Sequence, residues 1–361
     1  MFAPLSAETA RALEALLACI ERTFPLPARF AIKLPSEIAA LSRLFTSART
    51  ERDEGYFSRA GYRNAYLRYF LPWNVYRLCR LFASVGGGTE AAGIEHCAAR
   101  SEGAVQRRNA ALRQAQNLPW TADFEPMTLQ DGAVCVDIGS GTLALPIALW
   151  IAFPDLRSRR LVIYCVDKNA AALAAGRRLF DAFTAEAACK WHIVPVKTDF
   201  SRFKLDCKAD FVSSFNVFNE LYANIKQGDV DALTGLAGKT ARAVSRLLAP
   251  GGLLLAAEPG IPSAGQFISL YRAALLQEGF SILSPCTHHE SCPMQGGRRG
   301  KKWCHFVFDT AAVPKSLNAL SVQARLAKEK ATLSFLFAQL SDFRFQISDF
   351  GGGQLAVAGC R

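Results

Sequence analysis

The chain has 361 residues, half of them hydrophobic and a fifth charged, which is typical of a soluble globular protein with a sizeable core and more than one domain. No apolar run approaches the ~20 residues of a transmembrane helix, so we expect no association with a membrane. The formal net charge of +11 indicates an acidic partner rather than a basic one.

The excess positive charge lies on the two flanks of the chain. Residues 1–120 carry a net +6 and residues 284–361 a net +5, whereas residues 121–283 are neutral. An acidic partner that contacts both flanks would account for this distribution, and RNA is the partner we expect. A well-solvated surface is the alternative, because charge alone discriminates poorly between the two.

The N-terminal residues include Glu8, Glu14 and Glu21, which are unusual in secretory signals and in acid-poor transit peptides. Of the 11 cysteines, seven lie in apolar or helical patterns. We interpret these seven as small core residues in a reducing compartment. We therefore expect a cytoplasmic protein, and a monomeric one.

Residues 1–120 are predicted to form a helical N-terminal domain. Apolar residues recur at helical spacing in Ser6–Leu17 and again in Pro35–Phe45. The segment Tyr62–Trp73 is dense in arginines and aromatic residues, a combination that can stack bases and hold phosphates. For most of these residues we favour the simpler interpretation, a helix that packs its aromatic rings inward and turns its arginines outward.

The stretch Val134–Thr142 predicts a strand, a tight glycine turn and the start of a helix. Gly139 and Gly141 allow positive φ and close approach of a ligand, and the free N–H groups that open a helix favour electron-rich atoms. Gly139–Ala144 also fits the loose dinucleotide fingerprint. Asp137 favours a cofactor with a positive amino group instead, since dinucleotide folds have an apolar residue there. A turn that binds no ligand is the remaining alternative.

Residues 121–283 alternate strand and helix patterns, which predicts an α/β core with a mostly parallel, doubly wound sheet and helices on both faces. The strand Arg160–Asp167 ends where such folds place a ribose-binding carboxylate, so Asp167 is a candidate for that role. The strand Trp191–Asp199 ends in a carboxylate suited to the adenine amino group. A helix N-cap is nearly as good an explanation of Asp199.

A further predicted strand and its following loop occupy Ala209–Tyr222. Asp137-Ile-Gly-Ser-Gly141 resembles the first motif of class I methyltransferases. Because ligands of open α/β sheets lie outside the carboxyl ends of the strands, Asn216, Asn219 and Glu220 are candidate catalytic residues near a transferred methyl group. The loop has neither the Asn-Pro-Pro-Tyr pattern of enzymes that methylate amino groups of bases nor a cysteine nucleophile for cytosine C5. No specific chemistry follows from these residues.

Residues 284–361 are predicted to form a cysteine-rich metal-binding segment with C-terminal strands. Cys286, Cys292 and Cys304 lie close in sequence, with three of the five histidines among them. Clustered thiolates select zinc or an iron–sulfur cluster. The spacing is looser than in zinc ribbons, and the proline after Cys292 is familiar from ferredoxins. Cys360 can supply a fourth thiolate. Free cysteines in a flexible loop are the alternative.

Together these features resemble the methyltransferase-like family of small-ribosomal-subunit assembly factors, which occurs in mitochondria and in bacteria. The motifs that carry the resemblance span nearly the whole chain: Leu41–Ser42, Ala65–Pro72, Asp137–Gly141, Asn219–Leu221, Glu258–Gly260, Cys286–Pro293 and Trp303–Phe306. The cysteine segment is the specific part, because all class I methyltransferases share the glycine loop.

The resemblance implies a class I S-adenosylmethionine (SAM) methyltransferase fold, a 4Fe–4S cluster (zinc being the alternative) and association with the ribosomal RNA of the small-subunit precursor. The implied cluster ligands are Cys286, Cys292, Cys304 and Cys360. The implied SAM contacts centre on Asp137, Gly139, Gly141 and Asp167, to which we add Ser140 and Asp199.

Two functions stay open at this point. The first is a methyltransferase that acts on small-subunit ribosomal RNA, and the second is an assembly factor that binds this RNA without catalysis. We favour binding as the main role. A generic methyltransferase of small molecules explains neither the charge distribution nor the cysteines, and an NAD-dependent oxidoreductase does not explain Asp137.

Overall fold

The computed structural model describes residues 3–46, 55–85, 129–223, 225–226, 229–294 and 302–341. In the described part before residue 86 the chain is helical, whereas residues 86–120 of the predicted helical domain lie outside the described residues. The elements there are α1 (Ala7–Thr23), α2 (Ala28–Ala31), α3 (Leu34–Thr46), the 3-10 turn η2 (Tyr56–Ser58), α4 (Ala60–Ala65), the π-helical turn η3 (Tyr66–Phe70) and α5 (Leu71–Val85).

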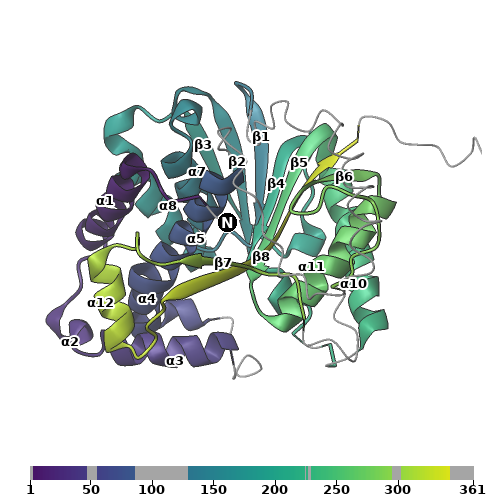
Figure 1. The fold of residues 1–361 in the computed structure, drawn as a ribbon. Helices are drawn as coiled ribbons and strands as arrows, with labels where there is room; N and C mark the ends of the chain where they lie inside the picture. The colour runs from purple at the N-terminus through teal and green to yellow at the C-terminus, as the bar shows by residue number, and fades with distance from the viewer. Residues whose placement is uncertain are drawn as a thin grey trace, which may run out of the picture.

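Strands and helices alternate from residue 133 onward (Figure 1). The strands are β1 (Ala133–Ile138), β2 (Leu161–Asp167), β3 (Trp191–Lys197), β4 (Ala209–Phe215), β5 (Leu248–Pro259), β6 (Phe280–Ser284), β7 (Phe306–Asp309) and β8 (Lys330–Leu340). The α-helices are α7 (Ala144–Ala152), α8 (Ala170–Thr184), α9 (Phe218–Leu221), α10 (Val230–Leu247), α11 (Pro262–Gln277) and α12 (Lys315–Gln323). Short 3-10 turns are η4 (Pro154–Ser158), η5 (Ala185–Ala187) and η6 (Phe200–Arg202).

The strands form one sheet in the order β3-β2-β1-β4-β5-β8-β6, with β7 paired to β8. Strands β1 to β5 are parallel to one another, and β8 runs antiparallel to β5, β6 and β7. The prediction of a mixed α/β, Rossmann-like sheet is therefore confirmed. The boundary that the sequence predicts between the α/β core and the C-terminal segment, at residue 283, does not separate two folding units. Strand β8 of the C-terminal segment lies inside the sheet, between β5 and β6.

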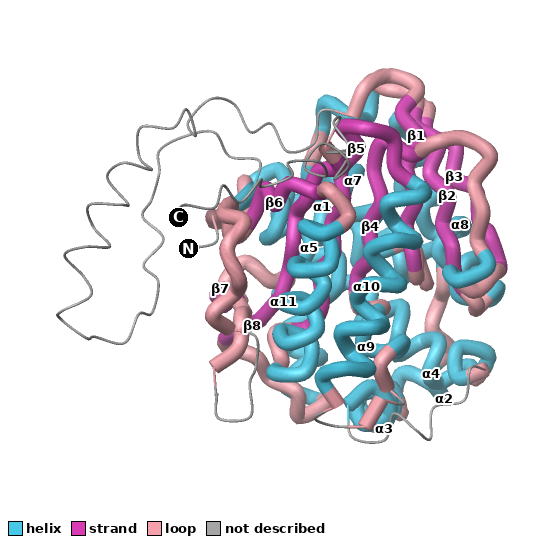
Figure 2. The backbone as a smooth tube through the Cα atoms, turned by 90° about the vertical axis from the view of Figure 1, so that its right-hand side faces the viewer, coloured by secondary structure: helices cyan, strands magenta, loops and turns pink. Residues whose placement is uncertain are grey.

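Two hydrophobic clusters cover the two faces of the sheet. Alternate strand residues face opposite sides, so Cys135 of β1 belongs to the cluster that includes α1, α5, α7 and α8, whereas Val136 belongs to the cluster of α10 and α11. Figure 1 shows α7 and α8 on one side of the strands and α10 and α11 on the other. Figure 2, turned by 90°, brings the α10–α11 layer toward the viewer.

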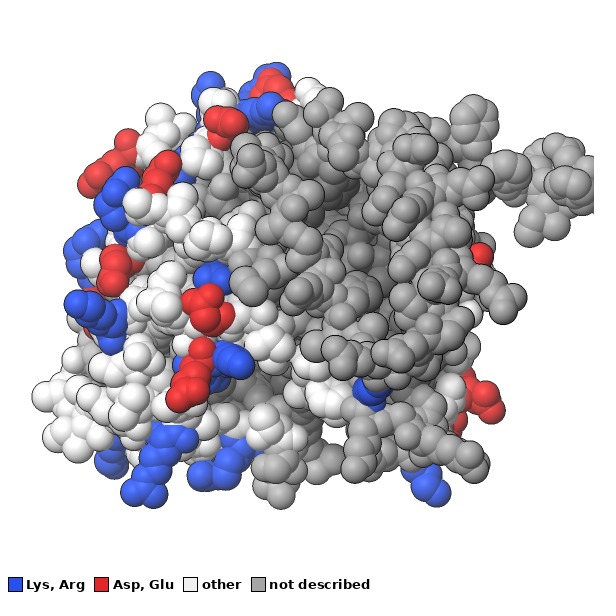
Figure 3. Space-filling model, viewed as in Figure 1, with Lys and Arg blue, Asp and Glu red and all other residues white. Residues whose placement is uncertain are grey.

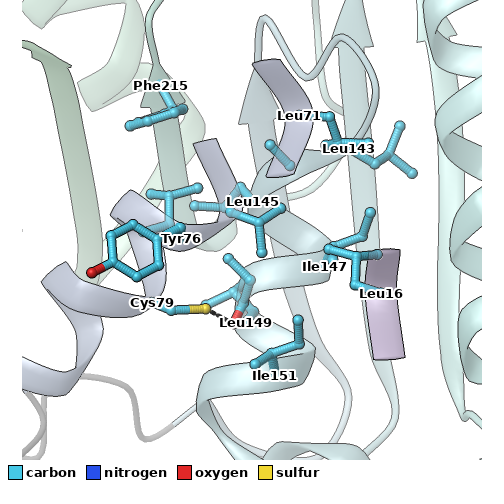
Figure 4. Close-up of a cluster of buried hydrophobic side chains, with 14 of the residues drawn as sticks. Leu16, Leu71, Tyr76, Cys79, Leu143, Leu145, Ile147, Leu149, Ile151 and Phe215 are labelled. Carbon is cyan, nitrogen blue, oxygen red and sulfur yellow. Dashed lines mark hydrogen bonds between the residues drawn. The ribbon is translucent and has the colours of Figure 1, made fainter. Parts of the chain in front are cut away.

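The helix α7, which follows the glycine loop, is buried almost all round. It packs between the sheet and the N-terminal helices. In Figure 4 the side chains of Leu145 and Leu149 lie beside Tyr76 and Cys79 of α5, and all four are at most 2 % exposed. The predicted helical domain thus shares a core with the sheet, and this packing fixes α5 next to the glycine loop. No helix in the described part of the chain is both long and apolar enough to cross a membrane.

Candidate functional site

A cavity of about 650 Å³ lies at the carboxyl ends of β1, β2 and β4. Its walls come from the N-terminal helices, the glycine loop, the ends of these strands and the segment 325–328 before β8. Eight of the nine residues predicted to bind cofactor or to catalyse are among those that line it: Asp137, Gly139, Ser140, Gly141, Asp167, Asn216, Asn219 and Glu220. These residues converge because parallel strands end at one edge of the sheet.

The glycine turn between β1 and α7 is held against the neighbouring strand. The backbone N–H of Gly139 donates to the carbonyl of Val166 in β2 at 2.7 Å. Gly139 has φ +68°, and a Cβ atom there would lie 2.2 Å from Cγ2 of Val217. Only glycine fits this position without a shift of the loop after β4. The turn therefore keeps its backbone exposed to the cavity.

Asp137 is the penultimate residue of β1, just before the glycine turn, and is 2 % exposed. Its carboxylate accepts hydrogen bonds from the hydroxyls of Ser140 and of Ser213, the latter at 2.9 Å. Burial raises the pKa of Asp137 to about 7, and the charge of Asp167 adds to the rise, whereas the two serine hydroxyls oppose it. A positively charged ligand group would favour the ionised carboxylate and so relieve this penalty.

Asp167 is the last residue of β2 and faces the glycine turn. Its carboxylate accepts the backbone N–H of Gly141 at 2.8 Å and that of Asn169 at 2.7 Å. These contacts hold the carboxylate at the wall of the cavity, at the place where doubly wound folds bind ribose hydroxyls.

Asp199 is described in the structure but lies outside the lining of this cavity. It forms an ion pair of 2.8 Å with Lys168 and caps η6 by accepting the backbone N–H of Ser201. The hydrogen bond from Lys168, aided by those from Ser201, lowers the pKa of Asp199 to about 2. Asp199 thus acts as a helix N-cap, which was the alternative to a contact with the adenine amino group.

The loop after β4 brings the predicted catalytic residues to the cavity. Asn216 has φ +59°, and its side-chain Nδ2 donates to Oδ1 of Asn74 in α5 at 3.3 Å. Asn219 donates from Nδ2 to Glu258 at the end of β5, at 2.9 Å. Glu258 is fully buried and carries a pKa raised to about 7, mainly by desolvation. Glu220 lines the cavity from the exposed side of the same loop.

Sequence reasoning missed the part of the wall that comes from η3 and α5. Six side chains of this helical run line the cavity, at positions 66, 69, 70, 73, 74 and 77. Tyr66 lies over the glycine loop, since its hydroxyl would be 3.8 Å from a Cβ on Gly141. The spacing of three and four residues was the available signal, because it places all six on one helix face. Arg68, between them, is 4 % exposed and paired with Glu21 rather than turned outward.

The cysteine segment lies beside α11. Sγ of Cys292 lies 3.7 Å from the hydroxyl oxygen of Ser269 in α11, and burial, followed by the charges of Cys286 and Cys292, raises the pKa of Cys304 to about 12. Arg272 of α11 holds their loop by donating to the backbone carbonyl of Glu290 at 2.9 Å. Within the described ranges no group of three or more His, Cys, Asp or Glu side chains is arranged to hold a metal ion. The predicted fourth ligand, Cys360, lies outside the described residues.

A family model described as mitochondrial small ribosomal subunit Rsm22 matches residues 120–344, which is more than half of the chain. The chain belongs to the Rsm22 family. This match confirms the resemblance that the sequence motifs carry. The Rsm22 match spans the glycine loop, the loop after β4 and the cysteines Cys286, Cys292 and Cys304. No curated protein matches the chain in sequence.

Several solved methyltransferases share a distant likeness with this Rsm22-family chain. A methyltransferase from Pyrococcus furiosus has a TM-score of 0.34 at 12 % identity, over 65 % of this chain and 98 % of its own. The 16S rRNA methyltransferase KamB has a TM-score of 0.35 at 15 % identity, and the match covers 61 % of this chain and 94 % of KamB. A magnesium protoporphyrin IX methyltransferase from Synechocystis, solved with bound SAH, has a TM-score of 0.32 at 13 % identity. This match covers 66 % of this chain and 82 % of the methyltransferase.

Proposed function

We propose that this Rsm22-family chain binds SAM in the cavity at the carboxyl ends of its strands and acts in assembly of the small ribosomal subunit. The observation that carries the proposal is the convergence of Asp137, the glycine turn and Asp167 on one cavity in a chain of this family. The cavity is of ordinary size for a cofactor site.

Each of these groups has a role toward SAM. The carboxylate of Asp137 would accept hydrogen bonds from the ammonium group of the methionine part, and that of Asp167 would accept them from the ribose hydroxyls. The turn at Gly139 and Gly141 lets the cofactor lie against the backbone. We leave Asp199 out of this site, because its carboxylate is already held by Lys168.

The partner that we propose is ribosomal RNA of the small subunit. Lys and Arg side chains gather along the lower edge of the face in Figure 3, where α3 lies. A groove there is lined by residues of α3 and of the end of α12, including the exposed Arg43 and Arg325. Exposed cations on both flanks of the chain suit a polyanion, whose binding would weaken as salt is added.

Whether a methyl group is transferred depends on the loop after β4. In a transferase, Asn216, Asn219 and Glu220 would lie around the acceptor atom. A binding-only role is the second candidate, and one observation favours it: Asn216 and Asn219 are engaged with Asn74 and Glu258 rather than directed at an acceptor.

The experiment that tests the proposal uses labelled SAM and immature small subunits, with methyl transfer and co-sedimentation as the two readouts. The test variant is Gly139→Arg, and the matched control is Gly235→Arg on α10, where a Cβ meets no atom within 4 Å. Transfer that is lost in Gly139→Arg would support an enzyme, and association without transfer would support binding alone. A wild-type protein that neither associates nor transfers would overturn the proposal.

We also propose that the cysteine segment holds a structural metal. Cys292 and Cys304 both lie against α11, at Ser269 and Gly265. With Cys286 they supply thiols of the type that iron–sulfur clusters and zinc require. Cys360 would complete the set. Such a group would stabilise the fold of this segment rather than serve in electron transfer. Iron with matching sulfide in anoxically purified protein would support a cluster, and zinc alone would support a structural zinc site.

A further inference from the structure

One helix face supplies a wall of the cavity that the proposed SAM contacts leave unexplained. It consists of Tyr66, Tyr69, Phe70, Trp73, Asn74 and Arg77, which run from η3 into α5. A π-helical turn inserts an extra residue into a helix and is frequent at functional sites. The last two members of this face are polar and lie toward the end of β4, since Asn74 accepts a hydrogen bond from Asn216.

Lys328 reaches the same wall from the segment between α12 and β8. Its Nζ donates to the hydroxyl of Tyr69 at 2.5 Å and to the carbonyl of Leu326 at 3.5 Å. It also lies 4.6 Å from the ring centre of Trp73 and 4.8 Å from that of Tyr69. The ammonium group is thus held between two aromatic rings, both of which are at most 2 % exposed.

Arg77 lies beside Lys328 with its own hydrogen-bonding capacity partly unused. Its Nη1 donates to Oδ1 of Asn74 at 3.2 Å, and its guanidinium lies 5.8 Å from the ring centre of Trp73. The Nε–H of Arg77 is buried and has no hydrogen-bond partner in the structure. A buried donor left in this state costs free energy until an acceptor arrives.

Neither cation has a counter-ion in the part of the chain that the structure describes. None of the ion pairs found there includes Arg77 or Lys328. Burial lowers the pKa of Arg77. Burial, and secondly the charge of Arg77, lower the pKa of Lys328 to about 7. Two desolvated cations without a carboxylate between them are unfavourable for the empty protein.

We propose that Arg77 and Lys328 form an anion subsite of the cavity, which takes a carboxylate or phosphate group of the bound ligand. The cavity would then have an acidic end at Asp137 and Asp167 and a basic end at Arg77 and Lys328. The inference deepens the proposed function, on which it rests for the identity of the ligand. The anion has two sources, the methionine carboxylate of SAM and a phosphate of the ribosomal RNA.

The test measures binding of three probes by calorimetry: SAM, 5′-methylthioadenosine, which lacks the carboxylate, and a fragment of small-subunit ribosomal RNA. The variants are Arg77→Met and Lys328→Met. The matched controls are Arg63→Met on α4 and Lys330→Met at the start of β8, both of them exposed cations outside the cavity lining. Because Met removes a desolvated charge at similar volume, we expect the test variants to melt at the wild-type temperature or above it.

If the carboxylate of SAM is the anion, both variants weaken SAM binding at least tenfold and leave 5′-methylthioadenosine unchanged. If RNA phosphate is the anion, both variants bind SAM and 5′-methylthioadenosine as the wild type does, whereas their affinity for RNA and the salt dependence of RNA binding fall. Unchanged SAM and RNA affinities would overturn the subsite, and so would equal losses of SAM and 5′-methylthioadenosine, which indicate altered packing instead.

A wild-type protein that binds neither SAM nor RNA would refute the proposed function while leaving the subsite testable. Inorganic phosphate then serves as the probe. Phosphate that binds the wild type and both controls but not the double variant would support the subsite, and equal binding or none would overturn it.

Discussion

The side chain of Asn219 donates from Nδ2 to Oε2 of Glu258 at 2.9 Å, and this bond ties the loop after β4 to the end of β5. The same carboxylate accepts the backbone N–H groups of Val217 and Phe218 at 2.7 and 2.8 Å. Glu258 has no exposed surface, so it replaces water as the partner of these amides. The position of the loop that lines the cavity therefore depends on one buried carboxyl group.

Glu258 should make the protein less stable as the pH rises toward neutrality. Desolvation raises the pKa of its carboxyl from 4.5 to about 7 in the folded state, although the hydrogen bonds from the loop oppose this rise. A carboxyl with a raised folded pKa contributes stability below about pH 4.5, and this contribution is lost as the pH rises through 7. We expect the loss to be on the order of 3 kcal/mol. Urea unfolding of the wild type and of Glu258→Gln at pH 5 and pH 8 measures this loss as the difference between the two proteins.

Glu258→Gln removes this titration, so its unfolding free energy should change less between the two pH values than that of the wild type. Asp137, whose pKa is also raised to about 7, titrates in both proteins and cancels in the comparison. An equal change with pH in the variant would show that Glu258 is not the group responsible.

Gly139→Ala should damage both the fold of the turn and the binding of SAM. The new Cβ would meet Cγ2 of Val217 at 2.2 Å, and alanine at φ +68° is strained in addition. We expect a loss of stability of at least ~1–2 kcal/mol and a tenfold or greater loss of SAM affinity. In Gly235→Ala, where a Cβ has open space in α10, stability should rise by up to ~1 kcal/mol. Similar behaviour of the two variants would argue against the close contact at Gly139.

Cys292→Ser should lower metal content, melting temperature and RNA association together. The reason is that a serine hydroxyl is a poor replacement for a thiolate ligand, and that metal binding supplies folding free energy to such segments. Iron, sulfide and zinc analysis beside a thermal melt measures the effect. Cys207→Ser is the matched control, because Cys207 is an exposed cysteine outside this segment. Metal content and melting temperature that stay at the wild-type level in Cys292→Ser would contradict a structural metal there.

The glycine turn, Asp137, Asp167 and Asn216 could be placed together from sequence because each lies at or just after the carboxyl end of a predicted parallel strand. Strands of one parallel sheet end at a common edge, so local patterns were enough. The position of β8 could not be predicted in this way. It comes from the C-terminal segment and inserts between β5 and β6, and no local pattern specifies a partner strand so distant in sequence.

The other wall of the cavity depends on contacts between distant segments. Asn74 contacts Asn216 across 142 positions of the sequence, and Lys328 contacts Tyr69 across 259. Neither contact can be predicted from residue spacing or composition. The aromatic and basic residues of Tyr62–Trp73, which run from α4 through η3 into α5, were visible in the sequence as a group. Spacing alone could group the lining residues on one helix face, but only the packing of α5 against α7 shows that this face meets the cavity.

The central claim is that the cavity binds SAM with its ammonium group at Asp137, and calorimetric titration of SAM into wild type and Asp137→Asn tests it most directly. The variant keeps the size of the side chain but removes the charge. One of the two serine hydroxyls that donate to Asp137 can turn to accept from the new amide group, so the fold should persist. We expect measurable binding by the wild type, at least tenfold weaker binding of SAM by the variant, and equal affinity of both for 5′-methylthioadenosine, which lacks the amino group. A folded wild-type protein that does not bind SAM, or a variant that binds it equally well, would contradict the account.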